Sequence, residues 1–168
     1  MTTLRKIVIV GLLIAVSACT NAGRFGDGGG TGAGAGGVVP GSASDPTSPA
    51  YFSQAIGDRV LFEVDQSTLT AEGQRILDGQ AQWLTTNSDY AATIEGHADE
   101  QGTREYNLAL GARRANAARE YLISRGVAGS RLKTISYGKE RPIEICSEES
   151  CYAKNRRAVT VLAGGLTG

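Results

Sequence analysis

Residues 94–122 read I-E-G-H-A-D-E-Q-G-T-R-E-Y-N-L-A-L-G-A-R-R-A-N-A-A-R-E-Y-L, and this stretch decides the fold. From Ile94 onward its first side chains alternate between two faces, which is typical of a short β-strand ending at Asp99. A polar turn follows, and the hydroxyl of Thr103 can accept from the free amides of a first helical turn. We expect the helix to end just before Gly126, which suits the left-handed residue that commonly follows a helix.

The predicted helix carries an arginine on its inward face. Leu110, Ala117 and Tyr121 are spaced by seven and four residues, which marks one buried stripe. Arg114 lies on that stripe, and Asn107 shares the same side. A buried arginine needs a partner, because an unpaired charge inside a protein is very costly.

Asp99, at the end of the preceding strand, is the nearest acidic partner for Arg114 in the chain. Two interpretations stay open. The pair forms a structural ion bridge that holds the strand–turn–helix corner, as most inward arginines do. Alternatively the two groups act as a clamp, in which the carboxylate takes an ammonium and the guanidinium takes a carboxylate of one zwitterionic ligand.

The charge balance argues against nucleic acid as a partner. The chain has 168 residues with 17 basic and 17 acidic side chains, and the length allows one domain plus appendages. From residue 51 onward the charges are almost balanced, with no stripe of basic and aromatic residues. That part of the chain has no electrostatic footprint for nucleic acid.

The first 18 residues are predicted to be a lipoprotein signal peptide. Two basic side chains precede an apolar run at residues 7–16, which is far shorter than the roughly 20 residues of a membrane-spanning helix. The following V-S-A-C ends in Cys19 and resembles the lipobox of bacterial lipoproteins, in which the cysteine is acylated. The alternative is an ordinary signal peptide with an incidental cysteine. Thr20, rather than an aspartate, follows Cys19 and points to the outer membrane.

Residues 19–50 are predicted to be the lipidated cysteine followed by a disordered, glycine-rich tether. The segment lacks the apolar side chains that offset the entropy of ordering. A coil of this length has an end-to-end spread of roughly 30 Å.

Cys146 and Cys151 stand five positions apart in C-S-E-E-S-C. This spacing suits a small disulfide-closed loop in an oxidising compartment, worth roughly 2 kcal/mol. A metal site is the rival interpretation, but two thiols without nearby histidines make a poor zinc cage. We favour the disulfide.

The remaining periodicities predict an α+β domain over residues 51–168. A strand at residues 60–65 ends in Asp65, a helix follows over residues 70–86, and further strands lie at 131–137 and 157–163. The βαβαββ order predicts a two-layer sandwich with a mixed sheet and helices on one face. Strand–helix–strand units imply parallel neighbours, and the last strand is expected to pair antiparallel. Asp65 and Asp99 then share one rim.

The long central motif, together with S-Y-G-K-E-R-P and K-N-R-R-A-V, resembles the OmpA-like peptidoglycan-binding domain. The resemblance covers residues 60–161. The lipobox and tether favour the branch of peptidoglycan-associated lipoproteins of the Tol–Pal system. An outer-membrane porin would need a barrel before this domain, and a flagellar stator protein would need a spanning helix.

The resemblance implies that Asp99 and Arg114 grip the diaminopimelate of a peptidoglycan stem peptide. Asp65 and Asn107 match further residues of the family's site, and no cofactor or metal is implied. We expect an alanine at Asp99 or at Arg114 to abolish cell-wall binding while the domain stays folded. The sequence departs from many members at residues 63–64, where Glu-Val replaces Asp-Phe, and in the cysteine loop.

An enzyme is the main alternative class, because two carboxylates on one rim could serve a glycosidase. The chain has no nucleophile beside a base, no set of metal ligands, and one histidine. We therefore expect a binding protein. A pure protein–protein adaptor is the third class. The resemblance implies an outer-membrane lipoprotein facing the periplasm, with roles in envelope integrity and cell division, whose partners include the periplasmic β-propeller protein and other Tol components.

Overall fold

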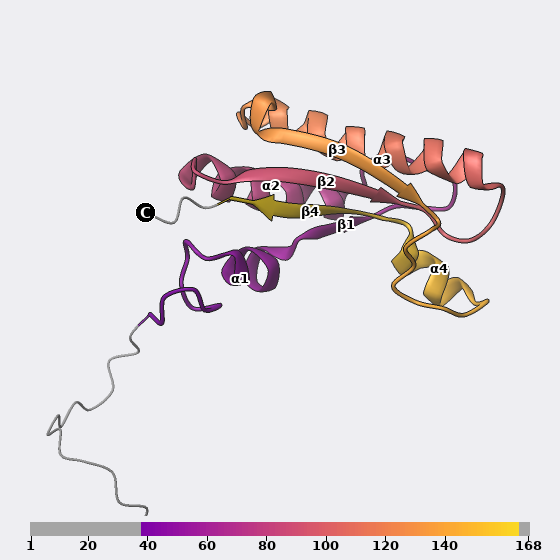
Figure 1. Ribbon diagram of the computed structural model, residues 1–168, viewed down its shortest axis with the longest axis horizontal. Coiled ribbons are helices and arrows are strands. Elements are labelled where there is room, and N and C mark those ends of the chain that lie inside the picture. Colours follow the sequence, from indigo (N-terminus) through magenta and orange to yellow (C-terminus); the bar gives the residue numbers. More distant parts are fainter. Residues whose placement is uncertain (1–37, 165–168) are drawn as a thin grey trace, which may run out of the picture. The chain divides into compact units, whose positions relative to one another are not determined.

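A four-stranded mixed sheet with strand order β1-β4-β2-β3 carries the domain (Figure 1). The computed structural model describes residues 38–164. In chain order the elements are α1 (Pro49–Tyr51), η1 (Phe52–Gly57), β1 (Arg59–Leu61), α2 (Ala71–Thr86), β2 (Ala91–His97), α3 (Arg104–Ser124), η2 (Gly129–Arg131), β3 (Leu132–Gly138), α4 (Glu149–Asn155) and β4 (Arg157–Ala163).

The strand pairing confirms the predicted α+β fold and corrects one detail of it. β2 and β3 pair in parallel, and β4 pairs antiparallel to β2, as expected. However, β4 also pairs antiparallel to β1, so it separates β1 from β2. A crossover helix is about 10 Å wide and strands lie about 4.8 Å apart, so α2 can place β2 two positions from β1. The last strand fills that gap.

The two long helices begin and end where the sequence predicts. The hydroxyl of Thr70 accepts from the backbone N–H of Gly73 at 3.0 Å, and α2 follows. The hydroxyl of Thr103 likewise accepts from the N–H of Tyr106 at 3.2 Å at the start of α3. Gly126, with φ of 98°, stands just past the end of α3. Both threonines therefore act as the N-caps that their positions indicate.

The buried face of α3 is rotated by about one residue from the predicted stripe. Ala117 and Tyr121 are half-buried, whereas Ala115, Ala118 and Leu122 are fully buried in the main core. The helix lies so close to the sheet that small side chains, rather than large ones, mark the contact. Alanines at these positions carry little apolar signal, which explains the shifted prediction.

Glycines on both sides permit this close approach of α3 to β2. A Cβ added at Gly96 would lie 1.8 Å from the carbonyl oxygen of Gly111, and one added at Gly111 would lie 2.4 Å from Oγ of Ser136. Ser136 also donates to the carbonyl of Leu108 at 2.6 Å. The backbone of α3 therefore contacts the backbone of β2 close to the end of the strand that leads to Asp99.

The structure differs from the sequence prediction in the length of the first strand, in the start of the folded part and in one additional helix. β1 ends at Leu61 instead of continuing to Asp65, and a turn follows. The folded part also starts before residue 51: the indole of Trp83 donates to the carbonyl of Pro46 at 2.7 Å, and Phe52 packs on Trp83 with 5.0 Å between ring centres. The helix α4, which the sequence analysis did not predict, projects beyond the end of the sheet where β2 and β3 finish (Figure 1).

No helix within residues 38–164 has both the length and the apolar composition needed to cross a membrane. The predicted signal peptide and lipidated Cys19 lie outside the described residues, as does most of the tether.

Candidate ligand-binding site

A cavity of about 240 Å³ opens where the end of β2 meets the start of α3. Three of the four residues that the sequence places in the site line it. The lining residues are Val64, Asp65, Asp99, Gln101, Gly102, Tyr106, Asn107 and Leu110. The fourth, Arg114, lies behind this wall and is not part of the lining.

The turn after β2 positions Asp99. Its Oδ1 accepts from the backbone N–H of Gln101 at 3.3 Å, and the residue is buried, with 8% of its surface exposed. Asn107, fully buried on α3, donates from Nδ2 to the carbonyl of Gln101 at 2.7 Å. Asn107 therefore holds the turn that carries Asp99, which is a positioning role.

Asp65 faces the same cavity from the turn after β1. It has φ of 56°, in the left-handed region that aspartate tolerates better than most residues. The phenol of Tyr106, on α3, donates to its carboxylate. This hydrogen bond is the main cause that raises the pKa of Tyr106. The two side chains join the β1–α2 turn to the first turn of α3 across the mouth of the cavity.

Arg114 is 0% exposed and makes no ion pair within 4 Å to Asp99. Its guanidinium donates to three backbone carbonyls, those of Gln66 at 2.8 Å, His97 at 2.9 Å and Glu63 at 3.2 Å. Burial lowers the pKa of Arg114 to about 10, and the charge of Asp99 partly opposes this shift. The side chain stays cationic at neutral pH, and its residue lies one helical turn along α3 from Leu110, which lines the cavity.

Of the two interpretations left open for Asp99 and Arg114, the structural ion pair is therefore wrong, and the ligand clamp stays a prediction. Asp99 Oδ2 instead accepts from Nη1 of Arg156 at 3.2 Å, and Nη2 of Arg156 reaches Glu149 Oε1 at 2.5 Å. Arg114 satisfies its donors with carbonyl oxygens, which a sequence does not reveal. In the sequence, Arg156 stands out only as part of the K-N-R-R-A-V motif, whose two arginines are both buried in the structure.

The predicted disulfide between Cys146 and Cys151 is confirmed, with 6.0 Å between the two Cα atoms. Its loop leads into α4, which contains Glu149.

A larger hollow of about 910 Å³ lies between β1, α2 and the α4 segment, and Glu149 and Arg156 line it. None of the four residues predicted for the site lines this hollow.

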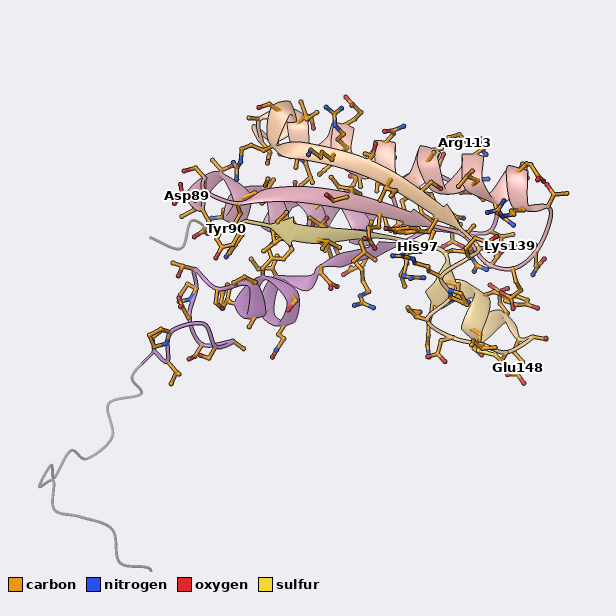
Figure 2. All side chains as sticks on the ribbon, in the orientation of Figure 1. Asp89, Tyr90, His97, Arg113, Lys139 and Glu148 are labelled. Atoms are coloured by element: carbon orange, nitrogen blue, oxygen red, sulfur yellow. A yellow bond between two sulfur atoms is a disulfide. The ribbon has the colours of Figure 1, made fainter. Side chains whose placement is uncertain are left out.

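A second buried group lies outside both cavities. The imidazole of His97 is buried beside the ring of Tyr137, with 5.6 Å between ring centres, and neither ring nitrogen has a hydrogen-bond partner within residues 38–164. Figure 2 shows it at the end of the sheet near Lys139. Burial, followed by the charges of Arg157 and Arg141, lowers the pKa of His97 to about 4.

Comparison with known proteins gives one consistent family. The OmpA family model matches residues 61–156. A peptidoglycan-associated lipoprotein of Rhizobium meliloti (strain 1021) is 56% identical over 138 residues, which are 82% of this chain and 75% of that protein. One from Agrobacterium fabrum (strain C58) is 49% identical over 165 residues, 94% of this chain and 87% of the relative.

A solved structure agrees with these relatives. The crystal structure of the peptidoglycan-associated lipoprotein from Burkholderia pseudomallei superposes with a TM-score of 0.64 at 37% identity. The match covers 71% of this chain and 97% of that chain.

Proposed function

The chain belongs to the OmpA family, among its peptidoglycan-associated lipoproteins, and on this basis we propose that it ties the outer membrane to the cell wall by binding peptidoglycan without a covalent bond. The ligand is the diaminopimelate of a stem peptide, whose side-chain end is a free zwitterion when it is not cross-linked. The observation that carries the proposal is the cavity itself, with Asp65 and Asp99 in its wall and the buried cation of Arg114 one turn of α3 away from Leu110, which also lines it.

In the proposed complex the ammonium of diaminopimelate lies against Asp99. One oxygen of that carboxylate is already bonded to Arg156, so Oδ1, which has one weak backbone contact, is the oxygen available to the ligand. Asp65 gives a second negative group on the other side of the cavity. Each charge-assisted bond contributes roughly 1.5–3 kcal/mol.

Arg114 serves the ligand's carboxylate from below. Its longest hydrogen bond, 3.2 Å to the carbonyl of Glu63, is the one that a ligand carboxylate displaces, because a carboxylate is the stronger acceptor for a guanidinium. The displaced carbonyl belongs to the same turn that carries Asp65, so the ligand also reorganises the mouth of the cavity. Asn107 keeps the opposite wall in place.

Binding rather than hydrolysis follows from how the carboxylates are held. Asp99 is bonded to a buried arginine and to a backbone amide, and Asp65 accepts from a phenol. Both carboxylates are thus engaged by groups of the protein itself, whereas a glycosidase needs one carboxyl group to protonate the leaving group and the other to attack or to activate water. The chain therefore holds the wall and leaves its bonds intact.

The cellular role that we propose combines this site with the N-terminal features. The lipid on Cys19 inserts into the outer membrane, the glycine-rich segment gives reach, and the domain faces the periplasm and stabilises the envelope, particularly at division. Confinement near the wall raises the effective concentration, so a modest affinity is sufficient.

The periplasmic β-propeller protein and other Tol components are proposed partners at the same surface. Val64 and Tyr106 line the cavity and are 55% and 44% exposed, which suits contact with another protein. A soluble stem peptide should then displace the purified propeller protein in a competition assay. Simultaneous binding of both would contradict a shared surface.

The test of the proposed function is co-sedimentation of the purified protein with cell-wall sacculi. We expect Asp99→Asn to lower the affinity at least about tenfold, because it removes a charge-assisted bond without changing shape. Asp89→Asn is the matched control, since Figure 2 shows Asp89 at the opposite end of the sheet from His97. Unchanged sedimentation of the Asp99 variant would contradict the proposal, and release of soluble fragments would indicate an enzyme instead.

A further inference from the structure

Arg156 connects the ligand cavity to the disulfide loop. It is almost completely buried, and its three donor groups reach the carbonyl of Phe62 at 3.2 Å, Asp99 Oδ2 at 3.2 Å and Glu149 Oε1 at 2.5 Å. Burial lowers the pKa of Arg156, but the bonds to Glu149 and Asp99 outweigh this effect and raise it above its ordinary value. One permanent cation is thus shared by two carboxylates from segments far apart in the sequence.

The charges of this group add to those of Asp65 and Arg114 at the place where a ligand ammonium would meet Asp99. Asp99 and Arg156 alone cancel each other, so a cation approaching Asp99 would find a neutral pair. Glu149 adds a second negative charge, and the three groups together carry a net charge of minus one. Near a protein surface the effective dielectric constant is about 20, so a charge one guanidinium away still acts strongly on the ligand.

The loop that carries Glu149 depends on its cross-link. Glu149 lies between Cys146 and Cys151 and is the first residue of α4, a short helix in which Asn155 is the only buried residue. Asn155 fixes the base of the loop by accepting from the backbone amides of residues 143–144 at 2.9 and 3.2 Å. Apolar burial does not hold the other end, so the disulfide restricts the positions that Glu149 can take.

We propose that the loop closed by Cys146 and Cys151 is a working part of the ligand site, with Glu149 as a positioning residue that neutralises Arg156 and so preserves the attraction of Asp99 for an ammonium. The inference rests on the proposed function, which it extends to a second segment of the chain. The cross-link acts by keeping the Glu149 carboxylate on Arg156.

The test is a calorimetric titration of the full chain, in detergent, with a defined stem peptide that ends in diaminopimelate. We expect Glu149→Gln, and separately Cys146→Ser with Cys151→Ser, to weaken binding roughly tenfold. Glu148→Gln is the matched control. It removes a carboxylate from the same loop, but Glu148 makes no ion pair within residues 38–164 and lies at the outer end of the loop in Figure 2.

Two readouts separate this electrostatic role from a merely structural one. The combined variant, with Glu149→Gln and both serines, should bind no more weakly than Glu149→Gln alone, because the cross-link then has no carboxylate to place. A stem peptide whose free ammonium is acetylated should bind the wild type and Glu149→Gln equally. Additive losses, or an equal loss for the acetylated peptide, would overturn the proposal.

The same titration with Asp99→Asn separates this inference from the proposed function. If Asp99→Asn keeps the wild-type affinity, the proposed function itself is wrong. If Asp99→Asn loses binding while Glu149→Gln binds as tightly as the wild type, only the present inference is overturned. Glu149 is largely exposed, so its glutamine variant should stay folded and decides the matter even if the serine variant unfolds.

Discussion

At the scale of single residues, two buried polar side chains, those of Arg114 and His97, decide how stability responds to substitution and to pH. Arg114 holds the turn that carries Asp65 through its bonds to the carbonyls of Glu63 and Gln66, and we propose that it also binds the ligand's carboxylate. His97 is buried without a hydrogen-bond partner for its ring within residues 38–164. Each should therefore affect stability in a way that an exposed residue of the same type does not.

Replacing Arg114 by methionine should lower the free energy of unfolding by about 3–5 kcal/mol, because three buried carbonyls lose their donor. The sequence alone leads to the expectation that an Arg114 variant stays folded and loses only binding; the three buried carbonyls add a cost in stability to that prediction. Urea denaturation measures the effect. Arg113→Met is the control on the exposed side of α3 (Figure 2) and should stay within about 0.5 kcal/mol of the wild type. Similar values for both variants would contradict the buried role.

His97 predicts a loss of stability in acid. Its pKa is about 4 in the folded protein and about 6.5 when unfolded, so the unfolded chain binds more protons between these values. Stability should therefore fall as the pH decreases from about 6.5 to about 4, by as much as about 3 kcal/mol. Glu95, whose carboxylate lies 3.7 Å from Nε2, is too distant for a strong hydrogen bond and does not reverse this sign.

The difference between the wild type and His97→Gln isolates this effect from that of the carboxylates. Urea denaturation should be measured between pH 4.5 and 7.5. The free energy of unfolding of the wild type should fall more steeply with decreasing pH than that of the variant. Arg157, Arg141 and Tyr137, which surround the imidazole, are unchanged in the comparison. Parallel curves would show that His97 takes up its proton without cost in the folded state.

At the scale of elements, the contact of α3 with β2 determines where the ligand cavity lies. Gly96 and Gly111 let the helix approach until its backbone touches the strand. This approach places Asn107 against the turn of Asp99 and brings Arg114 to the carbonyl of His97. A helix held farther out would separate the two walls of the cavity.

Gly96→Ala should therefore destabilise the domain by several kcal/mol, because its methyl group would lie 1.8 Å from a backbone oxygen that cannot move alone. Gly79→Ala, within α2, is the contrasting variant: its one near neighbour is the Cγ2 methyl group of Ile56 at 3.2 Å, and alanine favours a helix by about 1 kcal/mol over glycine. Thermal unfolding followed by circular dichroism compares the two. A stable Gly96→Ala variant would mean that α3 can retreat from the sheet.

At the scale of the whole molecule, the cavity is lined by three segments, which are the turn after β1, the turn after β2 and the start of α3; Arg156, the residue before β4, binds Asp99 in its wall. The sheet order brings them together, since β4 lies between β1 and β2. The N-terminal boundary is also set by packing, because residues 46–52 lie against α2 through Trp83.

A chain that begins at residue 36 should consequently unfold at the same temperature as the full chain. One that begins at Ser53 should lose about 3–5 kcal/mol, since it lacks the fully buried Phe52 ring and the cap at Ser48. Thermal scans of both, with the wild type, measure the difference. Equal stability of the shorter chain would place the start of the folded part at residue 53.

Much of the domain follows from local pattern. Alternation located β2 and β4, helical spacing located α2 and α3, Thr103 was predicted as the cap of α3, and the cysteine spacing gave the disulfide. The central motif also named Asp65, Asp99 and Asn107, which the structure brings to one cavity. These features depend on residues that are close together in the chain, so the local sequence pattern is enough to predict them.

Only the tertiary structure decided the partners of the buried charges. The sequence by itself determined that Arg114 points inward, but not that three carbonyls would bind it while Asp99 pairs with Arg156, 57 residues away. It determined the cysteine loop, but not that Glu149 in that loop reaches the same arginine. A backbone carbonyl is present at every residue, and an ion pair between distant segments depends on strand order, so neither leaves a local pattern to read.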